Sequence, residues 1–167
     1  MKIGRIDIKK WIKEIAAGAL LLLILSNIIS SLRKPHLDSS QLPSVTVPLV
    51  NGGVYHLKQG KPVIVHFWAT WCPTCKLEAA NIERISQKYE VLTVAVNSGS
   101  DEEIRQYLKE RDLSFRVLND KEGSWVQKFK VTAFPTTFIY TAKGELKFTE
   151  VGYTSTAGLL GRMILIE

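Results

Sequence analysis

An uninterrupted, almost entirely apolar run leads into the only two cysteines of the chain. The run is Val63–Trp68, and the cysteines follow in the segment Trp71-Cys72-Pro73-Thr74-Cys75. The length and β-branching of the run are typical of a central strand that is covered on both faces. A helical pattern starts directly after Cys75. This order of strand, dithiol and helix constrains the fold more than any other feature of the sequence.

The spacing of the two cysteines favours reactive chemistry. Thiols three residues apart in the first turn of a helix lie on one face of it, near free backbone N–H groups and the positive end of the helix dipole. Both effects favour the thiolate, which is the form of cysteine that reacts. The sequence therefore predicts that Cys72 and Cys75 form a redox-active pair.

Three other interpretations of the pair stay open. Cys-x-x-Cys can be half of a zinc site, but the chain has no second pair, and His36, His56 and His66 lack the spacing of ligands, so we expect no metal. A static structural disulfide would suit an oxidising compartment, although it would explain neither the neighbouring tryptophans nor the helix start. A non-enzymatic binding module is the third, because a fold does not fix a function.

The pattern along the rest of the chain predicts an α/β fold. Strands are expected at Ser44–Val50, Val54–Leu57, Val63–Trp68, Val91–Val96, Phe115–Leu118, Thr136–Tyr140 and Glu145–Val151. Helices are expected after the dithiol and at Asp101–Arg111, Lys121–Phe129 and Thr154–Ile166. Because strands and helices alternate, we expect parallel strands joined by crossovers, in a mixed sheet flanked by helices. The dithiol would lie at the carboxyl end of a central strand, where such sheets place their sites.

A charge-free segment near the N-terminus predicts a transmembrane helix. Ile15–Leu32 has no charged residue over 18 positions, close to the minimum for crossing a bilayer core of about 30 Å. More basic residues precede the segment than follow it, so the N-terminus is expected in the cytoplasm and the rest outside. We expect residues 1–34 to hold the cytoplasmic N-terminus and the anchor, 35–43 to be a linker, and 44–167 to form the external domain. A cleavable signal peptide is the main alternative, but no Ala-x-Ala site ends the segment.

The net charge of +6 belongs mostly to the N-terminal part of the chain. Residues 1–34 have a net charge of +5, which leaves a net charge of +1 for the external domain. The basic start is therefore a signal for membrane orientation. No basic stripe with interleaved aromatic residues follows it, so we expect no nucleic-acid partner.

Two motifs in the external domain resemble those of the thioredoxin superfamily. They are Phe67-Trp68-Ala69-Thr70-Trp71-Cys72-Pro73-Thr74-Cys75 and, later in the chain, Phe134-Pro135-Thr136-Thr137-Phe138. Within the superfamily the chain is most similar to the anchored TlpA-like thiol-disulfide oxidoreductases, and among these to the suppressor-of-copper-sensitivity protein D branch. The resemblance covers essentially the whole external domain and implies a thioredoxin-like fold.

This resemblance implies roles for several residues. Cys72 is expected to be the exposed nucleophile, and Cys75 the buried thiol that resolves the mixed disulfide. Pro135 matches a cis-proline beside the dithiol, which leaves the backbone of Phe134 free to pair with an extended substrate as an added strand. Trp71 is expected to bind substrate together with Phe134 and Pro135.

Two further residues are candidates for tuning the pKa values of the thiols. Glu78 matches an acidic residue near the dithiol of several TlpA-like reductases, and it either accepts a proton from Cys75 or is a solvated first-turn carboxylate. His66 stands where cytosolic thioredoxins have a buried aspartate. It is either a base toward Cys75 or, as we expect, a satisfied and neutral core histidine. Ala133 departs from the family pattern, which commonly has glycine there.

The expected function is thiol-disulfide exchange on extracytoplasmic protein substrates, without a cofactor. Cys72 attacks a substrate disulfide, and Cys75 then releases the product. The periplasm or cell exterior is oxidising, so a reductant there needs electrons from across the cytoplasmic membrane. The resemblance implies a DsbD-like transmembrane reductase as the donor. The Pro73-Thr74 dipeptide resembles that of cytochrome c maturation reductases and favours a reductant, while a thiol oxidase of the same fold stays the alternative.

Overall fold

The computed structural model describes residues 11, 13–18, 20, 21, 25, 28, 34, 35, 37 and 39–167. The chain divides into two units, Met1–Arg33 and Lys34–Glu167. In the first unit residues 13–18 are helical. No helix among the described residues is both long and apolar enough to cross a bilayer. Much of the predicted span lies outside the described residues, so the transmembrane anchor stays a prediction.

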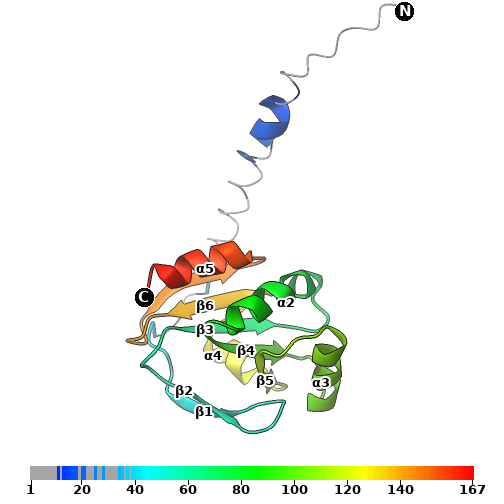
Figure 1. The fold of residues 1–167 in the computed structure, drawn as a ribbon, viewed down its shortest axis with the longest axis vertical. Coiled ribbons are helices and arrows are strands. Elements are labelled where there is room, and N and C mark those ends of the chain that lie inside the picture. The colour runs from blue at the N-terminus through cyan, green and yellow to red at the C-terminus, as the bar shows by residue number, and fades with distance from the viewer. Residues whose placement is uncertain are drawn as a thin grey trace, which may run out of the picture. The chain divides into compact units, whose positions relative to one another are not determined.

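A mixed sheet of five strands, in the order β5-β4-β3-β6-β7, forms the centre of the second unit (Figure 1). The three parallel strands are β3 (Val63–Trp68), β4 (Glu90–Val96) and β5 (Arg116–Asp120). The two antiparallel strands are β6 (Thr136–Tyr140) and β7 (Leu146–Val151). A separate hairpin pairs β1 (Val45–Pro48) with β2 (Val54–Leu57). The expected α/β fold with a mixed sheet and a lead-in hairpin is confirmed.

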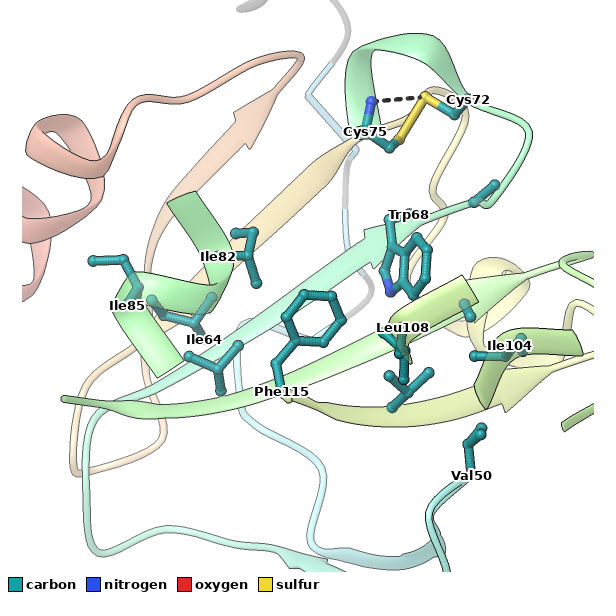
Figure 2. Packing of buried hydrophobic residues seen from close by; sticks show 14 of the residues in the cluster. Val50, Ile64, Trp68, Cys72, Cys75, Ile82, Ile85, Ile104, Leu108 and Phe115 are labelled. Atoms are coloured by element: carbon teal, nitrogen blue, oxygen red, sulfur yellow. Dashed lines mark hydrogen bonds between the residues drawn. A yellow bond between two sulfur atoms is a disulfide. The ribbon is translucent and has the colours of Figure 1, made fainter. Parts of the chain in front are cut away.

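Apolar side chains cover both faces of this sheet. One layer joins the sheet to α2 (Pro73–Ser86), α3 (Asp101–Glu110) and α5 (Thr156–Ile164), with Ile64, Trp68, Ile82, Ile104 and Leu159 among its members (Figure 2). The opposite layer joins it to the β1–β2 hairpin and α4 (Ser124–Lys128), with Val47, Leu57, Val65, Phe67 and Phe129 among its members. Successive side chains of a strand point to opposite faces, so all six residues of β3 are buried. This central position makes β3 a rigid base for the cysteines that follow it.

Two helices begin later than the sequence pattern predicts, and capping explains both differences. The expected helix at 121–129 starts at Ser124, because the Asp120 carboxylate accepts hydrogen bonds from the backbone N–H groups of Trp125 and Val126. The expected helix at 154–166 starts at Thr156, because the Ser155 hydroxyl accepts a hydrogen bond from an N–H group of the first turn. Thr154 therefore stays in the loop between β7 and α5.

The segment before the domain pairs with the β6–β7 turn. Gln41 forms a bridge with Glu145, and the Leu42 N–H donates to the Gly144 carbonyl at 2.7 Å. We call residues 39–42 the strap. In the register of the sheet, Tyr140 at the end of β6 lies opposite Val63 at the start of β3. The strap therefore joins the domain at the end of β3 that is remote from the cysteines.

Candidate dithiol site

Cys72 and Cys75 form a disulfide at the start of α2 (Figure 2). Cys72 is the N-cap of the helix, and its Sγ accepts a hydrogen bond from the Cys75 N–H at 3.2 Å. Pro73 opens the helix, where its missing N–H costs nothing. The predicted placement of both sulfurs at a helix N-terminus is therefore confirmed, and this placement favours a thiolate after reduction.

The expected exposure of Cys72 is wrong for this disulfide form. Cys72 is only 5% exposed, and Cys75 is 2% exposed. Sγ of Cys72 lies 3.8 Å from the Phe134 carbonyl oxygen, and the rings of Trp71 and Phe134 meet edge to face with centroids 5.8 Å apart. The segment around Phe134 therefore limits access to the first sulfur, which no local sequence pattern reveals.

The Phe134–Pro135 peptide bond is cis, as the resemblance implies. The bond directly precedes β6, whose Thr136 pairs with Phe67 of β3. The Thr136 hydroxyl donates to the Ala133 carbonyl at 2.8 Å and closes the turn. These contacts bring the two motifs that resemble those of the thioredoxin superfamily, which are far apart along the chain, to the same end of the sheet.

Trp71 is 56% exposed beside the disulfide. Its indole Nε1 donates to the Asn97 carbonyl at 3.1 Å, and the neighbouring Thr70 N–H donates to the Ser98 hydroxyl at 3.0 Å. Asn97 has a φ of 44°, in the left-handed region that asparagine tolerates better than most residues. The loop after β4 thus supports the segment before Cys72, a role that the sequence analysis missed.

His66 is a buried histidine of the central strand. It is 2% exposed, and its Nδ1 lies 2.9 Å from the Thr137 hydroxyl on β6. Burial lowers its pKa to about 3, because desolvation disfavours the imidazolium. The side chain is therefore neutral and satisfied, as expected for a core histidine.

Glu78 is also buried and lies beyond the first turn of α2, so its interpretation as a solvated first-turn carboxylate is wrong. It is 0% exposed, and its Oε1 accepts a hydrogen bond from the Thr154 N–H at 3.1 Å. Burial raises the pKa of Glu78 to about 8, although the Thr154 N–H opposes the shift by stabilising the carboxylate. Glu78 lies three residues after Cys75 in the same helix, and its proton affinity is suited to acid–base chemistry near neutral pH.

The comparison with protein families agrees with this geometry. Residues 37–160 match the Redoxin family. The chain belongs to the Redoxin family. Among its relatives, the thioredoxin-like protein YneN of Bacillus subtilis is 30% identical over 160 residues, which cover 87% of this chain and 91% of that protein. The thiol-disulfide oxidoreductase ResA of Bacillus cereus is 28% identical over 152 residues, which cover 87% of each chain.

A solved structure also resembles this Redoxin-family chain. The exposed lipoprotein thioredoxin Etrx1 of Streptococcus pneumoniae matches with a TM-score of 0.66 and 25% identity, over 74% of this chain and 99% of that one. The thioredoxin-like fold and the enzyme class predicted from the sequence, protein thiol-disulfide oxidoreductase, are confirmed.

One polar residue of this Redoxin-family site escaped the sequence analysis. Asn81 is 8% exposed, and its amide binds the loop between β7 and α5. The sequence feature that could have identified Asn81 is its position on α2 beside the apolar residues Ala79 and Ile82. Among the residues that the structure describes, no group of three or more His, Cys, Asp or Glu side chains could hold a metal ion.

Proposed function

We propose that the protein is a membrane-anchored thiol-disulfide oxidoreductase that reduces disulfides in extracytoplasmic proteins. The observation that carries the proposal is the Cys72–Cys75 pair at the start of α2, directly beside the Phe134–Pro135 segment. The pair can cycle between disulfide and dithiol without a cofactor, because thiolates exchange directly with disulfides.

In the reduced enzyme the Cys72 thiolate attacks one sulfur of a substrate disulfide. A mixed disulfide forms, and the other substrate sulfur leaves as a thiolate. Cys75 then loses its proton and attacks Cys72 Sγ, which forms the enzyme disulfide and releases the second substrate thiol. Two electrons pass from the enzyme to the substrate. Cys75 acts in this second, intramolecular step, as the resolving thiol.

Glu78 receives the proton of Cys75 in this proposal. A pKa of about 8 lets the carboxylate accept a proton near neutral pH and return it in the reverse step. The exposed Trp71 ring and the backbone at Phe134 hold the substrate, which pairs as an extended segment beside the disulfide. His66, neutral and bonded to Thr137, supports the central strand.

An N-terminal anchor, residues 1–34, holds the catalytic domain outside the cytoplasmic membrane. The sequence of this region supports the anchor, because Ile15–Leu32 has no charged residue over 18 positions. A DsbD-like transmembrane reductase returns the enzyme to the dithiol form. The sequence resemblance to the suppressor-of-copper-sensitivity protein D branch supports this partner, and the branch assignment stays a prediction.

Two experiments test the proposal. Reduction of insulin disulfides by the purified protein should disappear in Cys72→Ala, and full activity in this variant would contradict the mechanism. In cells, trapping of free thiols should find the pair mostly reduced when the membrane reductase is present and oxidised when it is deleted. A pair that stays oxidised in both strains would favour a thiol oxidase instead.

A further inference from the structure

Two polar side chains of α2 hold the loop that joins β7 to α5. Glu78 and Asn81, which lie about one helical turn apart, are 0% and 8% exposed. The Thr154 N–H donates to Glu78 Oε1, and Nδ2 of Asn81 donates to the Thr154 carbonyl, both at 3.1 Å. The helix that carries the dithiol therefore binds both backbone groups of Thr154.

Asn81 makes two more hydrogen bonds at the same place. Its Nδ2 also donates to the Tyr153 hydroxyl at 3.1 Å, and its Oδ1 accepts from the Thr156 hydroxyl at 2.9 Å. An asparagine amide offers two donor hydrogens and an acceptor oxygen, and here all three find partners. Because these partners belong to consecutive parts of the loop and α5, the amide fixes the position of the loop against α2.

The same loop reaches the segment beside the disulfide. The Gly152 N–H donates to the Pro135 carbonyl at 2.8 Å. Gly152 has a φ of 93°, a backbone conformation that other residues rarely adopt and that glycine allows. The Phe134 carbonyl lies 3.8 Å from Cys72 Sγ. A hydrogen-bonded path thus links Asn81, through the loop, to the segment that covers the first cysteine.

We infer that Asn81 is a positioning residue for thiol-disulfide exchange, because it holds Thr154 on Glu78 and the loop on Pro135. The inference rests on the proposed function in one respect, which is the transfer of a proton from Cys75 to Glu78. Asn81 acts through the Thr154 N–H, a donor that stabilises the ionised carboxylate of Glu78. Without this anchor the loop can move, and the carboxylate loses its described hydrogen-bond donor.

The Thr154 N–H has a large influence on the pKa of Glu78, because no neighbouring charge contributes to it. Burial and the Thr154 N–H are the two influences that set the pKa of Glu78. His66 of β3 lies on the sheet face that α2 covers, because it alternates with Val65 and Phe67 of the opposite layer, and it stays neutral. Cys75, the titratable neighbour on α2, is in the disulfide.

Titratable groups of the loop, α5 and β7 are engaged elsewhere. The Tyr153 hydroxyl is held by Asn81. Arg162 of α5 is paired with Glu150 of β7 at 2.9 Å. A change at Asn81 is therefore expected to reach Glu78 through the loop backbone, and not through a new charge.

The test replaces Asn81 by leucine, which has a similar volume and keeps Glu78 buried but forms no hydrogen bond. Carbon-13 NMR of the side-chain carboxyl, assigned with Glu78→Gln, should report a pKa of Glu78 about one unit higher in Asn81→Leu, in the full-length disulfide form. The matched control is Asn119→Leu, because Asn119 also binds a loop backbone, at Gly99, but on another part of the sheet. An unchanged pKa in Asn81→Leu, or an equal shift in the control, would overturn the inference.

Amide hydrogen exchange gives a second measurement, in the smaller substitution Asn81→Ala. The Thr154 and Gly152 amides should both exchange about tenfold faster, because each loses a fixed acceptor. Unchanged exchange at Gly152 would show that Asn81 does not stabilise the hydrogen bond to the Pro135 carbonyl, and it would contradict the inference. The experiment needs no activity, so it stays informative if Asn81→Leu folds poorly.

The pH profile of insulin reduction separates this inference from the proposed function. The ascending limb of the profile, along which Glu78 becomes ionised and able to accept a proton, should move to higher pH with the pKa of Glu78 in Asn81→Leu. The same substitution should cause no further movement in a Glu78→Gln background. Full activity of Cys72→Ala would contradict the proposed function, but it would not affect the conclusion from the NMR measurement. An additive effect of Asn81→Leu and Glu78→Gln would mark a merely structural role and end the inference alone.

Discussion

At the residue scale, Glu78 has the environment that most affects the chemistry of the site. A carboxylate on the surface of a helix is ordinarily solvated by water, which stabilises its ionised form. Here the side chain is buried, Oε1 has one backbone donor, and Oε2 has no hydrogen-bond partner among the described residues. The effect of burial on the pKa therefore exceeds that of the Thr154 N–H, and Glu78 keeps its proton to a higher pH than an exposed glutamate does.

The raised pKa of Glu78 predicts a specific pH dependence of stability. Between its ordinary value of 4.5 and its folded value of about 8, the unfolded chain releases the proton while the folded protein keeps it. Stability therefore falls as the pH rises through this window, by up to about 1.4 kcal/mol per pH unit, and the fall ends above the folded pKa. Glu78→Gln, which cannot ionise, should lack this contribution when urea unfolding of the disulfide form is followed across the window.

The control for this prediction is Glu122→Gln, because Glu122 is an exposed carboxylate outside the site. It should retain the pH dependence of the unmodified protein. Equal slopes in Glu78→Gln and the unmodified protein would show that burial of Glu78 does not govern the effect.

Residue environments were the least predictable part of the site. The Cys72–Cys75 disulfide and the cis bond before Pro135 agree with the short motifs of the sequence, whereas the catalytic roles of these residues stay a prediction. The burial of Glu78 depends on Thr154, which lies 76 positions away in the sequence. Long-range contacts of this kind leave no local pattern, so the alternatives for Glu78 could only be separated in three dimensions.

At the scale of the elements, apolar runs predicted the strands well, whereas helix starts depended on caps. β3 and β6 both have the predicted bounds, because each is a continuous apolar or β-branched run that begins directly after a proline. α3 also starts at the predicted residue, Asp101, and the structure shows a capping box of Ser100 and Glu103 there. For α4 the cap comes from Asp120 at the end of the preceding strand, which helical periodicity does not include.

The capping box of α3 predicts a measurable contribution to stability. The Ser100 hydroxyl accepts a hydrogen bond from the Glu103 N–H at 3.2 Å, and the Glu103 carboxylate accepts one from the Ser100 N–H at 2.7 Å. Ser100→Ala should lower the free energy of unfolding by about 1 kcal/mol in urea titrations, because an orphan N–H loses its partner. Ser86→Ala is the comparison, since its hydroxyl bonds a carbonyl within α2 and caps no helix start. A smaller loss in Ser100→Ala than in Ser86→Ala would contradict the prediction.

At the scale of the whole molecule, the catalytic domain includes the strap that precedes the first strand. Leu42 is 4% exposed and belongs to the apolar layer on the hairpin side of the sheet. The Leu146 N–H donates to the Ser40 carbonyl at 2.7 Å, so the strap is bound by backbone as well as by side chain. The predicted linker at 35–43 thus contains residues that are part of the folded domain. The sequence did not reveal this, because separate leucines in a polar stretch do not show that they are buried.

A pair of leucine substitutions tests how much the strap contributes. Leu42→Ala should lower the free energy of unfolding by about 2–5 kcal/mol, because it removes buried methyl groups and leaves a cavity. Leu77→Ala should change it by less than about 0.5 kcal/mol, since Leu77 is 74% exposed. Both values come from urea unfolding of the disulfide form. Equal losses in the two variants would mean that the strap does not pack as part of the core.

The attachment of the strap has a consequence for the reach of the enzyme. The strap joins the domain at the β6–β7 turn, while the disulfide lies past the other end of β3. A six-residue strand spans about 20 Å, and this length separates the point of attachment from the sulfurs. If a membrane tether continues from the strap, the sulfurs lie at the opposite end of the domain from it. Rotation of the domain about the tether would then move the sulfurs through a larger volume than movement of the tether alone.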